Sequence, residues 1–141
     1  MLVQMPMIVP IAAGDYAFKV FDRAEALSTG AQVTLSNKAL QLTGGPTSAK
    51  APDGRNPYGW VMENNQADIF LTYCTNAVLA QKEVSQLKIV QLPDNLSVGA
   101  NYGLTVIEGA QVDSTELALF ILSPQGQTIL AKYGFDAPTL P

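Results

Sequence analysis

The chain has 141 residues, of which 48% are apolar and 14% charged, and its formal net charge is −4. This is the composition of a globular domain, since disordered chains are poorer in apolar residues and richer in charge. The sequence has no cluster of Lys and Arg, which argues against nucleic-acid binding, and no histidine, which removes the commonest general base and metal ligand.

The N-terminal segment is apolar but makes a poor secretory signal. Residues 1–13 contain no Lys or Arg and are interrupted by Pro6 and Pro10, whereas a signal peptide starts with a basic stretch. We expect residues 5–11 to form a strand or a lead-in to a helix. The helix is predicted over residues 14–26, where apolar side chains recur at helical spacing.

The middle of the chain alternates between helix and loop signals. Residues 35–42 predict a second short helix, and residues 44–55 are rich in turn-forming residues and predict the longest loop. Asn56 is a preferred N-cap and Pro57 is favoured at the first helical position. A helix over residues 57–65 is therefore expected, with Trp60 and Val61 turned inward.

Apolar strands follow this helix. Residues 67–74 predict a strand that ends at Cys74, a cysteine expected to be small, buried and chemically inert. We expect Thr75 and Asn76 to cap a short helix over residues 77–81. Further strands are predicted over residues 87–92 and 98–107.

Two helices are predicted at the C-terminus. The first spans residues 114–122, and the spacing of Asp113 and Glu116 indicates a capping box. The second spans residues 124–133, with Ser123 as its N-cap and Gly134 just beyond its end. Apolar strands that alternate with helices predict a layered α/β domain.

Ligands of open α/β sheets lie at the carboxyl ends of the strands, against helix N-termini. Three such places carry suitable groups, namely Ala13 with Gly14, Arg55 with Asn56, and Tyr73 at the end of a predicted strand. Unpaired N–H groups at a helix start favour an oxyanion. Arg55 adds a permanent cation and Tyr73 a hydroxyl donor, so we predict a ligand-binding site made of these five residues.

Several segments resemble one protein family. They are GDYAFKVF (14–21), ADIFLTYCTNA (67–77), KIVQLP (88–93), YGLTV (102–106) and SPQGQTILAKYGF (123–135). Over residues 13–135 the chain resembles the second half of molybdate-type periplasmic solute-binding proteins of ABC transporters, which are type II periplasmic binding proteins.

The resemblance implies two α/β lobes that trap an oxyanion between them with backbone N–H groups and hydroxyls. It implies no metal, no cofactor and no catalytic residue. The family positions that match are Ala13, Gly14, Arg55, Asn56 and Tyr73. Arg55 departs from the pattern, because simpler members carry an apolar residue there. Its guanidinium is expected either to make a second contact with the ligand or to indicate a ligand other than molybdate.

The resemblance also implies that the first lobe is missing. Residues 1–94 are then a ligand-binding region like the second lobe, and residues 95–141 are a crossover strand and C-terminal helices that would return to the absent lobe. The expected partners are a small oxyanion and the membrane permease of an importer, with a periplasmic location. The C-terminal segment, left without its lobe, is expected to expose apolar surface, to fold back, or to pair with a second copy of the chain.

Other functions stay open at this stage. The chain is either the binding component for an oxyanion such as molybdate or tungstate, a module of the same fold for another small anion or organic acid, or an inactive truncated fragment. An enzyme is not expected, because the carboxylates near the predicted site, Asp15, Glu63 and Asp68, and the thiol of Cys74 have no histidine partner.

Overall fold

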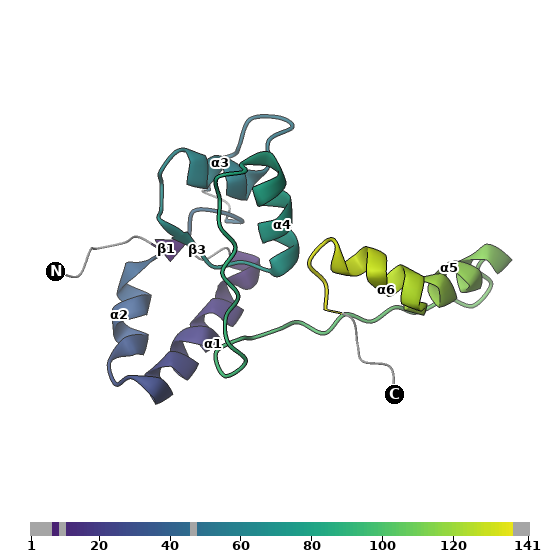
Figure 1. Ribbon diagram of the computed structural model, residues 1–141, viewed down its shortest axis with the longest axis horizontal. Coiled ribbons are helices and arrows are strands. Elements are labelled where there is room, and N and C mark those ends of the chain that lie inside the picture. The colour runs from purple at the N-terminus through teal and green to yellow at the C-terminus, as the bar shows by residue number, and fades with distance from the viewer. Residues whose placement is uncertain (1–6, 9–10, 46–47, 137–141) are drawn as a thin grey trace. The chain divides into compact units, whose positions relative to one another are not determined.

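The computed structural model describes residues 7–8, 11–45 and 48–136 (Figure 1). The chain divides into two units, residues 1–99 and residues 100–141. The elements of the first unit are β1 (Met7–Ile8), α1 (Ile11–Leu27), α2 (Ala31–Lys38), β2 (Ala39–Leu40), α3 (Pro57–Glu63), β3 (Ile69–Phe70) and α4 (Cys74–Glu83). The second unit contains α5 (Val112–Leu122) and α6 (Pro124–Ala131).

The strands form one small parallel sheet in the order β2-β1-β3. Met7 of β1 pairs with Ala39 of β2 on one side and with Ile69 of β3 on the other. Each strand has two residues. The predicted mixture of helices and strands is confirmed, although helices dominate, and the layered lobe stays a prediction. Of the strand predicted over residues 5–11, Met7–Ile8 is observed and the other strand positions up to residue 10 lie outside the described residues.

Helix α1 carries the main core of the first unit. Ala17, Val20 and Phe21 are buried, as their spacing predicts, and Phe21 is fully covered. The helix begins at Ile11, three residues earlier than predicted. It is tied to the next helix by Glu25, whose carboxylate accepts hydrogen bonds from the N–H groups of Gly30 and Gln32 at the start of α2. This contact lowers the pKa of Glu25.

The second helix was placed wrongly by the sequence pattern. Residues 35–42 do not form a helix of their own, because α2 is Ala31–Lys38 and Ala39–Leu40 pair with β1 as strand β2. Gly30 precedes α2 with φ 85°, a left-handed conformation that glycine adopts without strain. The chain thus turns earlier than the apolar pattern indicates.

Helix α3 confirms the local signals around it. The side chain of Asn56 caps it by accepting hydrogen bonds from the N–H groups of Tyr58 and Gly59. Val61 is buried together with Ala67, whereas Trp60 is half-buried against this second core. A local cap thus fixes where α3 begins, and burial of Val61 fixes its orientation.

The strand predicted over residues 67–74 is much shorter than expected. Strand β3 ends at Phe70, and Cys74 is the first residue of α4 and only half-buried, so its expected place in a strand was wrong. Tyr73 is the N-cap of α4, and Thr75 and Asn76 lie inside the helix. Helix α4 continues to Glu83, past the predicted end at residue 81.

The strands predicted over residues 87–92 and 98–107 are absent, since residues 84–111 contain neither helix nor strand. An extended segment forms a strand only where another strand satisfies its N–H and C=O groups. Residues 101–107 are all exposed, so their backbone groups face water. Their apolar, β-prone composition does not produce a strand without a neighbouring strand.

The second unit is a helix pair joined at Ser123. The Oγ of Ser123 accepts a hydrogen bond from the N–H of Gly126 and caps α6, as predicted. Gly134 has φ 85°, which suits its predicted position beyond the helix end. The capping box at Asp113 was wrong, because Asp113 lies inside α5 and Gln111 precedes the helix without a side-chain cap.

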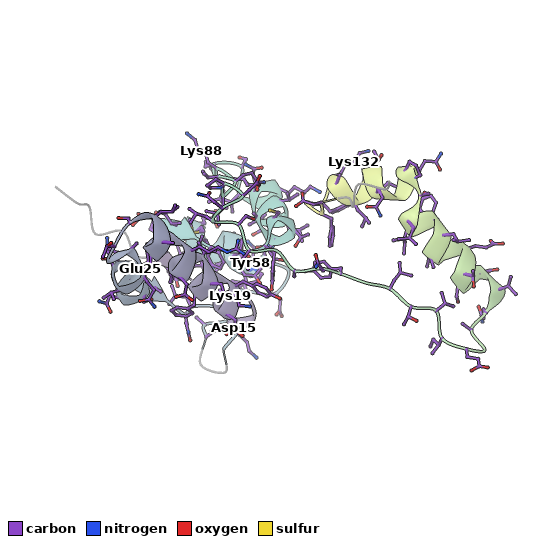
Figure 2. All side chains as sticks on the ribbon, turned by 90° about the horizontal axis from the view of Figure 1, so that it is seen from below. Asp15, Lys19, Glu25, Tyr58, Lys88 and Lys132 are labelled. Atoms are coloured by element: carbon purple, nitrogen blue, oxygen red, sulfur yellow. The ribbon has the colours of Figure 1, made fainter. Side chains whose placement is uncertain are left out.

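Helix α5 exposes apolar side chains around most of its circumference. They are Val112, Leu117, Leu119, Phe120 and Leu122. Figure 2 shows side chains standing away from both helices of this unit. A helix that is apolar all round is normally covered by other protein. Among the described residues, no helix combines the length and apolar character needed to cross a membrane.

Candidate functional site

The strand order places two helix starts at one edge of the sheet. Strands β1 and β3 are parallel neighbours, with Ile8 paired to Phe70. Helix α1 begins three residues after β1, and α4 begins four residues after β3. Both starts therefore lie at the carboxyl ends of adjacent strands.

The order β2-β1-β3 also puts a switch point between β1 and β3, because the chain moves to one side after β1 and returns to the other side at β3. Ligands of open α/β sheets bind at such a point.

A small cavity lies beside this edge. Its volume is about 50 Å³. Five apolar residues form most of its wall, and three residues with hydroxyl groups complete it. The apolar residues are Ala17, Val20, Leu71, Leu92 and Val98, and the hydroxyl-bearing ones are Tyr16, Thr72 and Tyr73. The cavity thus combines an apolar lining with a few polar groups, as small-molecule sites commonly do.

Tyr16 and Tyr73 both line the cavity and contact each other. Their rings are 5.9 Å apart between centroids and meet edge to face at 65°. Both residues are half-buried. The ammonium of Lys19, one turn further along α1, lies 5.2 Å from the centroid of the Tyr16 ring. Figure 2 labels Lys19 and Asp15 on the same helix. A positive charge is thereby held close to the ring of Tyr16.

The predicted residues Ala13 and Gly14 lie in the first turn of α1 rather than before it, because the helix begins at Ile11. The N-cap residue and the first three residues of a helix have N–H groups without a carbonyl partner within that helix. The N–H of the fourth residue already bonds to the carbonyl of the N-cap residue, as the N–H of Trp60 does to Asn56 in α3. Ala13 is the third residue of α1 and Gly14 the fourth. Ala13 is therefore the suitable donor of this pair, on the edge that also carries Tyr73, and Gly14 lies beside it.

Arg55 and Asn56 lie at a different place. The Nε of Arg55 donates to Oε1 of Glu83 at 2.5 Å, and the backbone N–H of Asn56 donates to Oε2 of the same carboxylate at 2.8 Å. Glu83 is the last residue of α4, nine residues after Cys74. At a rise of 1.5 Å per residue this separates Glu83 from the start of α4 by about 14 Å. The structure therefore groups Ala13, Gly14 and Tyr73 at one edge and places Arg55 and Asn56 beside the far end of α4.

Arg55 also forms an ion pair with Glu63 at the end of α3. Hydrogen bonds to the two glutamates, Glu63 first, raise the pKa of Arg55. The guanidinium, followed by the N–H of Asn56, lowers the pKa of Glu83. The side chains of Arg55 and Glu83 are 36% and 28% exposed. The predicted cation thus already has two carboxylate partners.

A second, larger cavity does not suit an anion. Its volume is about 320 Å³, and it lies between the C-terminal ends of α3 and α4. The residues around it are Met62, Glu63, Asn65, Val84, Gln86 and Leu87. Its charged group is the carboxylate of Glu63, which offers an anion no donor and is already paired with Arg55. The smaller cavity at the strand ends is therefore the stronger candidate, although it has less volume.

Three contributors to the geometry were not predicted as site residues. Tyr16 and Thr72 line the cavity, and Glu83 binds Arg55 and Asn56. The spacing of three residues between Ala13 and Tyr16, close to one helical turn, was a usable signal for Tyr16, since it puts both on the same face of α1. No sequence signal indicated Glu83, which is 28 residues from Arg55. Within the described residues, no group of three or more His, Cys, Asp or Glu side chains is arranged to hold a metal ion.

Comparison with known proteins gives one family and one relative. The family model described as bacterial extracellular solute-binding protein matches residues 8–136. An uncharacterized protein of Pasteurella multocida (strain Pm70) is 32% identical over 122 residues, which are 86% of this chain and 49% of that protein. The chain thus spans about half the length of this curated relative. No solved structure matches.

Proposed function

The chain belongs to the bacterial extracellular solute-binding protein family, and from this we propose that it forms the second-lobe half of the substrate-binding component of an ABC importer. Its ligand is a small anion held at the carboxyl ends of β1 and β3. The observation that carries this proposal is the convergence of two helix starts and Tyr73 on the switch point of the sheet. Members of this family are generally not enzymes, and we assign the chain no reaction.

The ligand that we propose is a tetrahedral oxyanion such as molybdate or tungstate. The N–H group of Ala13, with Gly14 beside it, and the hydroxyl of Tyr73 supply the proposed contacts. Donors at a helix start bind an anion without a counter-charge of their own, because the helix dipole favours negative charge there. The apolar wall of the cavity supports a second candidate, a small organic acid, since an inorganic oxyanion has no apolar part to place against that wall.

Arg55 and Asn56 belong to this proposal only under one condition. Their donors face the carboxylate of Glu83, so a ligand gains them only when Glu83 moves away. Arg55→Ala distinguishes the two cases. A loss of more than about 1.5 kcal/mol in binding free energy would show that the guanidinium contacts the bound anion. Unchanged affinity would leave Arg55 as a link between α3 and α4.

The proposed partner of the working protein is the membrane permease of the importer, and the proposed location is the periplasm.

We also propose that the exposed face of α5 is covered by a second copy when the chain is alone, because its apolar side chains are too numerous to stay in water. Sedimentation velocity over a range of concentrations tests this. Leu119→Lys should shift the chain toward monomer, and concentration-independent sedimentation of the unmodified chain would contradict it.

The binding proposal is tested by titration with molybdate, tungstate, sulfate and phosphate while the fluorescence of Trp60 is followed. Trp60 lies in the first unit and packs against the core of Val61 and Ala67. Saturable change with the first two anions alone would support the molybdate-type ligand. Saturation only with an organic acid would favour the second candidate. No fluorescence change, together with no heat of binding in a parallel calorimetric titration at millimolar concentration, would contradict binding of these oxyanions.

A further inference from the structure

The cavity beside the proposed anion site is suited to an apolar group. Its apolar lining residues come from three separate segments, namely Ala17 and Val20 from α1, Leu71 after β3, and Leu92 with Val98 from the segment that follows α4. Ala17 and Val20 are buried residues of the main core. A water molecule is poorly stabilised in such a space, because it finds few hydrogen-bond partners there.

The size of the cavity limits what it holds. Its volume is about 50 Å³, several times the roughly 10–15 Å³ that one water molecule requires. A substituent of a few heavy atoms fits, whereas a sugar or an aromatic ring does not. An oxyanion oxygen placed there would lose its hydrogen bonds with water and find apolar walls in their place.

The hydroxyl-bearing residues of the cavity are neighbours of one another. Tyr73 is the N-cap of α4, and Thr72 precedes it. Tyr16 contacts the ring of Tyr73, and the ammonium of Lys19 lies over the ring of Tyr16. The positive end of α4 and this ammonium both favour a negative charge beside Tyr73 and Tyr16.

We propose that the ligand of this site is an organic tetrahedral oxyanion, an alkanesulfonate or alkylphosphonate with a short chain. Its anionic head lies at the carboxyl ends of β1 and β3, and its alkyl group enters the cavity formed by Ala17, Val20, Leu71, Leu92 and Val98. This inference rests on the proposed anion site and specifies its ligand. It reconciles the donors at the helix starts with an apolar wall that an inorganic oxyanion cannot use.

The test compares sulfonates that share one head group and one charge. Methanesulfonate, ethanesulfonate and 1-propanesulfonate are titrated into the full chain by calorimetry, with sulfate and molybdate in parallel. Affinity should rise about fourfold with each added carbon, as expected for burying one methylene group, and should level off once the cavity is full. Equal affinity along the series, or binding of sulfate or molybdate with exclusion of the sulfonates, would overturn this inference alone. Absence of binding by every anion would overturn the proposed anion site as well.

A cavity-filling variant tests whether the alkyl group of the ligand binds in this cavity. Val98→Phe places a larger side chain at the wall and should abolish the gain from methanesulfonate to propanesulfonate. Val90→Phe is the matched control, because Val90 lies in the same segment, is 84% exposed and does not line the cavity. If Val98→Phe fails to fold, as its melting curve will show, the chain-length series on the unmodified protein still tests whether the site binds an alkyl group. An unchanged chain-length dependence in a folded Val98→Phe would contradict the proposed location.

Discussion

The ring of Tyr16 meets the ring of Tyr73 edge to face, with 5.9 Å between the centroids. This contact joins the second turn of α1 to the residue that caps α4. It therefore links the two helix starts that lie at the carboxyl ends of β1 and β3. The orientation of the Tyr73 ring, and with it the position of its hydroxyl group, depends on this neighbour.

We expect Tyr16→Ala to lower both stability and anion affinity. Edge-to-face aromatic pairs contribute about 0.5–1.5 kcal/mol beyond their buried area, and loss of the ring also frees Tyr73 to change its orientation. Tyr16→Phe keeps the ring and should restore the stability. Urea unfolding and calorimetric titration measure the two effects. A Tyr16→Ala protein as stable as the original would show that this ring contact is dispensable.

The Glu83 carboxylate should make stability depend on pH. Its pKa is lowered from the ordinary value of 4.5 by Arg55 and the N–H of Asn56. Because the folded state holds this carboxylate in its charged form, the stabilisation is present above the unfolded pKa and is lost as pH falls through the lower, folded pKa. Glu83→Gln should therefore reduce the melting temperature at pH 7, and the difference from the unmodified chain should shrink below pH 4.5.

The comparison of these two proteins at each pH isolates Glu83 from other groups. Glu25 also has a lowered pKa, but it is present in both proteins and its effect cancels. Glu63→Gln is a useful control, since Glu63 binds Arg55 and is 51% exposed. It should produce a smaller change than Glu83→Gln, which also alters the contact with the Asn56 N–H. A difference that stays constant down to pH 3 would contradict the ionic origin of the contribution.

Asn56→Ala should destabilise the first unit by about 1 kcal/mol, the usual contribution of a helix N-cap. The Asn56 side chain accepts hydrogen bonds from the N–H groups of Tyr58 and Gly59 at 3.0 and 2.9 Å. Asn56→Ser keeps a capping oxygen and should recover most of the loss. The free energy of unfolding in urea distinguishes them, and equal destabilisation by both substitutions would argue against capping as the cause.

Gly126→Ala should disrupt the junction of α5 and α6. A Cβ at this position would lie 2.1 Å from the carbonyl oxygen of Phe120 and 2.7 Å from that of Ile121. Backbone atoms cannot yield as a flexible side chain does, and overpacking of this kind costs typically about 1–3 kcal/mol. We expect less helix by circular dichroism and faster proteolysis near Ser123.

Gly103→Ala is the matched control for this substitution. Gly103 lies in the same unit, and a Cβ there would meet no atom within 4 Å. Its helix content and proteolysis pattern should equal those of the unmodified chain. If Gly126→Ala behaves in the same way as Gly103→Ala, the close approach between the helices does not occur in solution.

Local signals in the sequence predicted the features that depend on local contacts. Asn56 and Ser123 cap their helices as expected, because a capping oxygen bonds to N–H groups only two or three residues away. The buried face of α1 follows from helical periodicity alone. The core of the first unit and the starts of α3 and α6 could therefore be predicted without knowledge of the fold.

Features that depend on distant partners could not be predicted. Residues 98–107 have the composition of a strand but form none, because strand formation requires a partner that periodicity does not reveal. The pairing of Arg55 with Glu83 joins residues 28 apart, and composition contains no signal for it. The contact of Tyr16 with Tyr73 depends on the register of β1 against β3. The sequence thus predicts Tyr73 as a site residue but does not predict its neighbour Tyr16.

The most direct test of the central claim is a calorimetric titration of the chain and of Tyr73→Phe with molybdate, tungstate and the short alkanesulfonates. Tyr102→Phe is the control, because Tyr102 lies in the second unit and is 69% exposed. If a small anion binds at the carboxyl ends of β1 and β3, the unmodified chain and Tyr102→Phe will bind with equal affinity. Tyr73→Phe will bind several-fold more weakly, as expected for loss of a hydrogen bond to a charged ligand, and its melting curve checks that it is folded. Anion binding that is identical in all three proteins, or absent from all three, would contradict the claim.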